Sequence, residues 1–186
     1  VEIWIDQTVT ADFIVAPAGW PHVVRGGTSA QVLPGVWRAR LAGTAHVTAV
    51  DVYRDVRIDL DGRPTALVSR DVALHAARSR YLFLEGESAM ILTRVAAGEG
   101  AIISEVVANS LQVAKGSRLS IPTPMGPKSL MVLGVFYDYA TDGGKIVIDR
   151  SLYREWWNDD GVTVFPVYAE PGADLEQTRT ALLETL

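Results

Sequence analysis

The chain contains no cysteine and only three histidines in its 186 residues. Without thiols it cannot form a disulfide, a thiolate zinc site or a cysteine nucleophile. His22, His46 and His75 lack the HExxH spacing, and no neighbouring carboxylates complete a sequence-local zinc site. We therefore expect no metal and no cofactor in this chain.

Long apolar runs are also missing. No stretch of about eighteen apolar residues occurs, so no segment is long enough to span a membrane as a helix. No signal peptide is visible. The chain starts at Val1 without a methionine, which is typical of a domain excised from a longer protein.

Patterns that would indicate catalysis or nucleotide binding are incomplete. There is no GxSxG elbow, and Gly126-Pro127-Lys128-Ser129 matches only the end of a Walker A loop. Asp138 and Asp142 stand four residues apart with no closing Glu, so turn formation is favoured over a calcium site. The net charge of −5 argues against a nucleic-acid partner.

The composition is that of a folded protein, with 48% hydrophobic and 21% charged residues. Short apolar or alternating runs predict strands at 11–16, 46–60, 64–69, 100–103, 117–121, 129–136, 145–148 and 162–168. Helical spacing and capping residues predict helices at 34–42, 72–80, 89–97, 105–112, 152–157 and 174–186. The candidate caps are Asp71, Ser104 and Asp174, with Asp149 or Ser151 before 152–157. Asp61-Gly62 predicts a tight turn of hairpin type. Within 132–160, the two strands around the loop 138–144 are expected to pair with each other.

Trp156 and Trp157 stand side by side on a short predicted helix. Adjacent helical residues point about 100° apart. We therefore expect one tryptophan in the core and one half-covered. The alternative is an exposed aromatic anchor, so the two residues are a possible partner surface.

Three motifs follow one another in the second half of the chain. They read GEGAIISEVVA at 98–108, GSRLSIPTPMG at 116–126, and VLGVFYDY at 132–139 followed by Gly144. In order and spacing they resemble the MacB-like periplasmic core domain, the extracytoplasmic domain of FtsX/MacB-like ABC transporter permeases. The residues that carry the match are Ser104, Glu105, Gly116, Thr123, Pro124, Gly126, Gly134, Asp138, Tyr139 and Gly144.

The resemblance implies an α+β fold of two lobes. A ferredoxin-like porter lobe next to the membrane would comprise 1–61 and 136–186. A mixed α/β lobe, 62–135, would be inserted in it. The porter lobe would hold strands 11–17, 46–58, 145–149 and 162–168 and helices 34–42 and 151–157. Residues 20–33 match nothing in the family.

The same resemblance implies a place and a role. The domain would be soluble on its own and would lie on the periplasmic face of the cytoplasmic membrane, with residues 1–10 leaving the membrane as a helix. It would be non-catalytic and would transmit motion from ATP hydrolysis to an unknown extracytoplasmic substrate or protein. Its partners would be a cytoplasmic nucleotide-binding ATPase, reached through transmembrane helices, and a second permease copy.

Two other classes of function stay open at this point. One is a stand-alone secreted module that binds a ligand, and the other is a metal-assisted hydrolase that uses Asp138 and Asp142. If the transporter interpretation holds, Asp138-Tyr139 and Gly143-Gly144 are expected to form the turn where the chain leaves the inserted lobe, with hydrogen bonds between the lobes.

Overall fold

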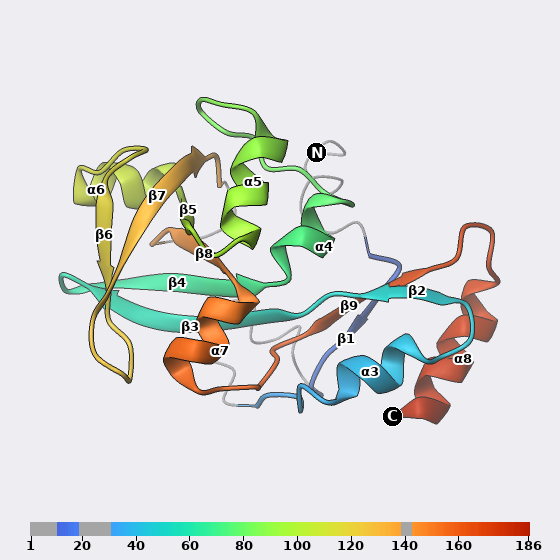
Figure 1. Ribbon diagram of the computed structural model, residues 1–186. Helices are drawn as coiled ribbons and strands as arrows, with labels where there is room; N and C mark the ends of the chain where they lie inside the picture. The colour runs from blue at the N-terminus through green and yellow to red at the C-terminus, as the bar shows by residue number, and fades with distance from the viewer. Residues whose placement is uncertain (1–10, 19–30, 139–142) are drawn as a thin grey trace. The chain divides into compact units, whose positions relative to one another are not determined.

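The computed structural model describes residues 11–18, 31–138 and 143–186 (Figure 1). Over these residues it contains helices and two β-sheets, which confirms the α+β class. The chain divides into two compact units. The smaller unit combines Val1–Arg54 with Asp160–Leu186, and the larger unit is the continuous segment Asp55–Asp159.

The smaller unit is built on a three-stranded antiparallel sheet. Its strands lie in the order β1 (Phe13–Val15), β9 (Phe165–Ala169) and β2 (Val47–Val50). The described residues of this unit include two helices, α3 (Trp37–Ala42) and α8 (Leu175–Thr185). A core that includes Leu41 of α3, Val167 of β9 and Leu182 of α8 joins these elements.

The larger unit is built on a mixed six-stranded sheet. In spatial order the strands are β3 (Tyr53–Leu60), β4 (Arg63–Arg70), β8 (Lys145–Asp149), β5 (Gly100–Ser104), β7 (Lys128–Phe136) and β6 (Arg118–Ile121). Strands β4 and β8 are parallel, as are β5 and β7. Strand β8 runs antiparallel to β5, and β6 runs antiparallel to β7. The carboxyl ends of β5 and β7 therefore lie at the edge of the sheet where β8 begins.

Where the larger unit is described, it has four helices: α4 (Val72–Ala76), α5 (Ser88–Ala96), α6 (Glu105–Leu111) and α7 (Arg150–Trp157). The predicted capping residues are confirmed, because the side chains of Asp71, Ser104 and Asp149 accept backbone N–H groups at the starts of α4, α6 and α7. Asp174 caps α8 in the same way.

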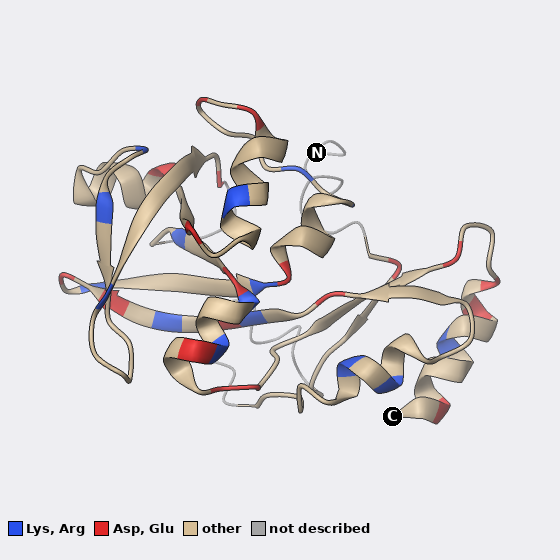
Figure 2. Cartoon of the chain, in the orientation of Figure 1, with Lys and Arg blue, Asp and Glu red and all other residues tan. Residues whose placement is uncertain are grey.

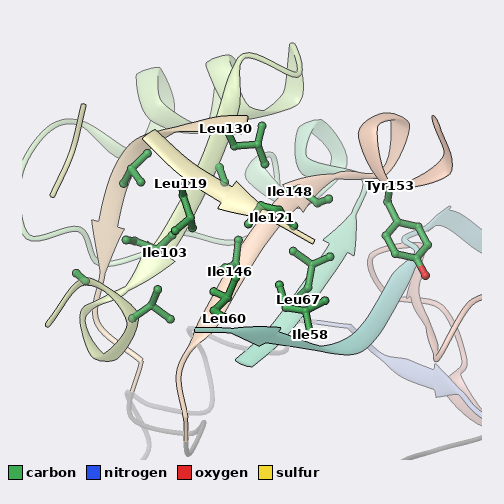
Figure 3. Close-up of a cluster of buried hydrophobic side chains, with 14 of the residues drawn as sticks. Ile58, Leu60, Leu67, Ile103, Leu119, Ile121, Leu130, Ile146, Ile148 and Tyr153 are labelled. Atoms are coloured by element: carbon green, nitrogen blue, oxygen red, sulfur yellow. The ribbon is translucent and has the colours of Figure 1, made fainter. Parts of the chain in front are cut away.

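The core of the larger unit lies between the sheet and helices α6 and α7. Figure 3 shows the buried side chains directed toward one another from six strands and from α7. Strand β5 is buried at all five positions. A strand covered on both faces reads as a continuous apolar run, as this one does. The labelled members of the cluster are Ile58, Leu60, Leu67, Ile103, Leu119, Ile121, Leu130, Ile146, Ile148 and Tyr153.

Two of the sequence-based assignments to lobes were wrong. Strand β8 and helix α7 were expected in the porter lobe, but β8 pairs with β4 and β5 inside the larger sheet, and α7 packs in the same core. The ferredoxin-like sheet expected for the porter lobe therefore loses one strand, and its described part is three-stranded. An apolar run such as 146–148 shows that a strand is buried but not which sheet it joins.

Two predictions of pairing also fail. Strands β7 and β8 do not form a hairpin, because β5 lies between them. The single strand predicted at 46–60 is two strands, β2 and β3, which join different sheets. The predicted turn at Asp61-Gly62 is confirmed, with both residues at positive φ between β3 and β4.

Within the described ranges, no helix has both the length and the apolarity needed to cross a membrane. The expectations for residues 1–10 and 20–30, and for Tyr139 and Asp142, concern residues outside those ranges.

Candidate functional site

Several motif residues meet at one edge of the larger sheet. Ser104 is the last residue of β5, and Glu105 begins α6 immediately after it. Asp138 follows β7, and Gly144 precedes β8. Because these strand ends lie at the same end of the sheet, the topology brings together residues up to 41 positions apart in the chain. We call Ser104, Glu105, Asp138, Gly144 and Lys145 the strand-end cluster.

Ser104 ties strand β8 to the start of helix α6. Its side chain is fully buried, and its Oγ accepts a hydrogen bond from the backbone N–H of Lys145 at 2.9 Å. The same oxygen caps α6 by accepting from the N–H of Val107 at 3.4 Å. One hydroxyl thus satisfies two backbone donors from different elements.

Glu105 and Asp138 hold the end of β7 against the same helix. The Oε2 of Glu105 accepts from the backbone N–H of Asp138 at 2.8 Å. The carboxylate of Asp138 pairs with the ammonium of Lys145 at 3.3 Å, and these two side chains are only 6% and 16% exposed. A shielded pair of this kind costs much to break, because removing one partner leaves the other charge poorly solvated.

Gly144 fits closely against α6. Its φ is +82°, and a Cβ at this position would lie 2.6 Å from Cγ2 of Val107 and 3.0 Å from Oγ of Ser104. Only glycine combines this backbone conformation with so close an approach. The family-motif glycine therefore has a packing reason in this chain.

Gly134 has a similar role on the opposite face of the sheet. A Cβ there would lie 2.9 Å from Cε1 of Phe83. The ring of Phe83 rests on the bare backbone of β7, and Phe83 forms a β-bridge with Phe136. This glycine thus allows the segment before α5 to dock on the sheet.

The remaining motif residues lie around the β6–β7 hairpin. Thr123 Oγ1 donates to the carbonyl of Gly126 at 2.6 Å and accepts from the N–H of Met125 at 3.2 Å, which closes a turn that includes Pro124. Gly116 donates its N–H to the carbonyl of Val132 at 2.8 Å. The structure thus divides the motif residues between the hairpin, the strand-end cluster and the Phe83 docking site on β7.

The strand-end cluster joins elements rather than presenting reactive groups. Its serine and glutamate accept backbone hydrogen bonds, and its aspartate is paired with a lysine. Over the residues that the structure describes, no group of three or more His, Cys, Asp or Glu side chains is placed to hold a metal ion. The hydrolase alternative required Asp138 as a metal ligand, whereas here Asp138 is engaged with Lys145.

Comparison with known proteins connects this arrangement to a transporter fold. No family model matches the chain. An uncharacterized ABC transporter permease of Mycobacterium tuberculosis, Rv0987, is 29% identical in an alignment of 182 residues that covers 92% of this chain. The chain spans only 20% of that relative's length.

Two solved structures have the same fold. The periplasmic region of MacB from Actinobacillus actinomycetemcomitans superposes with a TM-score of 0.63 over 92% of this chain and 79% of its own, at 11% identity. The chain has the MacB periplasmic fold. The extracellular domain of the noncanonic ABC-type transporter YknZ from Gram-positive bacteria gives a TM-score of 0.61 over 83% of this chain and 82% of its own, at 13% identity. The resemblance drawn from the sequence motifs is confirmed.

Within this MacB-like domain, the turn between β7 and β8 differs from the prediction. It was expected where the chain leaves the inserted lobe, but both strands belong to the larger sheet, and the chain leaves that unit only at Asp159. The contacts from Asp138 to Glu105 and Lys145 stay inside the larger unit.

The two tryptophans of α7 divide as the helical geometry predicts. Trp156 is buried in the core of the larger unit, with the Lys128 ammonium 6.0 Å from its ring centroid. Trp157 is half-buried and stacks on Tyr153 with ring centroids 4.9 Å apart. That these residues form a partner surface stays a prediction. Part of the Trp157 side chain is accessible for such a contact.

A second polar group, which the sequence analysis missed, lies where β4 and β8 end, opposite the strand-end cluster. Arg70 ends β4 and Asp149 ends β8, and the two residues pair in register. Arg70 Nη1 lies 3.3 Å from Nε2 of His75, and all three residues are buried. Because arginine can only donate, Nε2 must accept, and the neutral imidazole carries its proton on Nδ1. Burial, and to a lesser extent the charge of Arg70, lowers the pKa of His75 from 6.5 to about 2. The sequence did carry a signal for this group, because a charged residue directly follows each of two predicted strands: Arg70 after 64–69 and Asp149 after 145–148.

Proposed function

We propose that this chain is the extracytoplasmic domain of an ABC transporter permease, non-catalytic itself, and that it transmits motion from cytoplasmic ATP hydrolysis to an extracytoplasmic substrate or protein. The observation that carries the proposal is the match in fold to a MacB periplasmic region over 92% of the chain. The permease relative, which aligns over the same share, supports it independently of the fold.

The larger unit has the cohesion that transmission of motion requires. Its sheet has six strands, and partly buried hydrogen bonds and an ion pair lock the ends of β5, β7 and β8 to α6. Close-packed interiors transmit displacement because they compress little. A unit of this kind moves as one body when force is applied to it.

The smaller unit is the natural neighbour of the membrane. Both ends of the chain, at Val1 and Leu186, belong to it. If the domain is inserted between transmembrane helices, those helices attach to this unit. In this proposal the larger unit contacts the extracytoplasmic substrate or protein. A cytoplasmic nucleotide-binding ATPase and a second permease copy complete the transporter.

Labelling of the intact parent permease tests the location. Met125 is 63% exposed at the β6–β7 turn, and this chain has no native cysteine, so only cysteines elsewhere in the parent permease have to be replaced before the test. We expect Met125→Cys to react with a membrane-impermeant maleimide in intact spheroplasts. Leu67→Cys, at a fully buried position, is the matched control and should react only after denaturation. Labelling of Met125→Cys that requires lysis of the cells would place the domain in the cytoplasm and refute the proposal.

A further inference from the structure

The segment between α4 and α5 forms an additional, outer strand on the larger sheet. The N–H of Leu84 donates to the carbonyl of Val135 at 2.9 Å, and the N–H of Tyr137 donates to the carbonyl of Leu82 at 3.0 Å. Phe83 bridges Phe136 between these bonds. We call residues 81–84 the edge segment.

The edge segment has one backbone side directed away from the sheet. Leu82 and Leu84 use their backbone groups toward β7, so the N–H and C=O of Phe83 point outward. Over the described part of the chain, no strand pairs with this outer side. An open strand edge is a template for pairing with another strand.

Apolar side chains are exposed on one face of the edge segment. Leu82, Leu84 and Tyr137 are 53%, 50% and 42% exposed. Residues opposite each other or two apart in an antiparallel pair share a face. These three side chains therefore form a continuous apolar strip along the open edge.

Charges of opposite sign flank the strip. Arg80 precedes the edge segment, whereas Glu85 and Glu87 follow it, and all three are exposed. Figure 2 shows the acidic residues in the turn that leads into α5. A strand with one sign of charge at each end is complementary to itself when the second copy runs antiparallel.

From this complementarity we infer that the edge segment is a homodimer interface, in which two copies of the chain pair their edge segments antiparallel about a two-fold axis at Phe83. In this register Leu82 of one copy lies opposite Leu84 of the other. The long side chain of Arg80 then reaches Glu85 and Glu87 of the second copy. The interface is small, so we expect a dissociation constant on the order of 10⁻⁴ M for the free domain.

Charge reversal tests the pairing. In sedimentation velocity at low salt, we expect the unmodified chain to form dimers as its concentration rises from about 10 µM to about 1 mM. Arg80→Glu, and separately Glu85→Arg with Glu87→Arg, should each weaken self-association at least about tenfold. An equimolar mixture of the two variants should restore dimers. Arg118→Glu, an exposed reversal on β6, is the control and should leave the dimer unchanged.

Cysteine pairing tests the register. An equimolar mixture of Leu82→Cys and Leu84→Cys chains should form a disulfide-linked heterodimer on mild oxidation, since opposite residues at a non-hydrogen-bonded position lie closest. Met90→Cys, more exposed on α5, should cross-link far less. A chain that remains monomeric at about 1 mM, reversal variants that do not restore each other, or equal cross-linking at Met90 would each overturn the inference. A monomeric result would leave the proposed transporter function untouched.

Discussion

We expect Gly144→Ala to lower the free energy of unfolding by about 4 kcal/mol. At φ +82° an alanine is strained by about 1–2 kcal/mol. Its Cβ would also overlap Cγ2 of Val107, 2.6 Å away, and Oγ of Ser104, 3.0 Å away. Forcing a methyl group into a filled site costs about 1–3 kcal/mol more. Urea denaturation of the isolated chain measures the loss.

Gly62→Ala is the matched control for that measurement. Gly62 has φ +79° and no atom within 4 Å of a built Cβ. Its substitution should therefore cost only the backbone strain, about 1 kcal/mol. Equal losses for the two variants would show that Gly144 is not packed against α6, and the account of the strand-end cluster would be wrong.

We expect His75 to make the chain less stable in mild acid. The folded state holds its pKa near 2 because the ring is buried beside Arg70, whereas the unfolded chain titrates near 6.5. Between these values the unfolded state binds a proton that the folded state does not. The stabilisation is complete above pH 6.5 and is lost as the pH falls toward 2. Linkage gives a loss of about 3 kcal/mol between pH 7 and pH 4.

Carboxylates also titrate over that range, so the measurement compares two chains. His75→Gln keeps an acceptor for Arg70 but cannot take up the proton. Its unfolding free energy should fall less steeply with acidity, and the difference between the two curves isolates the histidine. Parallel curves for the two chains would mean that His75 titrates normally in the folded state, contrary to its burial.

Local features of the fold could be predicted from the sequence. The caps at Asp71, Ser104, Asp149 and Asp174 were predicted because a capping side chain binds donors only two or three residues ahead. The turn at Asp61-Gly62 followed from the same kind of short-range rule. In each case the physics lies within one turn of the chain.

Sheet membership could not be predicted in this way. Residues 146–148 are apolar in succession, which a buried strand requires in either sheet. Their partners in β4 lie about eighty residues earlier in the chain, and no local pattern encodes that choice. The same limit explains why β2 and β3 were predicted as one strand.

The strand-end cluster could be predicted only in part. The sequence motifs identified Ser104, Glu105, Asp138 and Gly144 but did not show why these residues lie close together in the structure. That reason is the junction of β5, β7 and β8, where 33 residues separate Asp138 from Glu105 and 41 separate Lys145 from Ser104. Lys145 was missed because a lone lysine before an apolar strand carries no signal.

The central claim is that the domain moves with the ATP cycle of a transporter. It is tested by spin-label distances in the reconstituted parent permease with its ATPase. One label sits at Met125→Cys and the other in a transmembrane helix. We expect this distance to change when ATP is trapped with vanadate. The distance between labels at Met90→Cys and Met125→Cys, both exposed in the larger unit, should stay constant. A Met125-to-membrane distance that is the same in the nucleotide-free and trapped states would contradict the account.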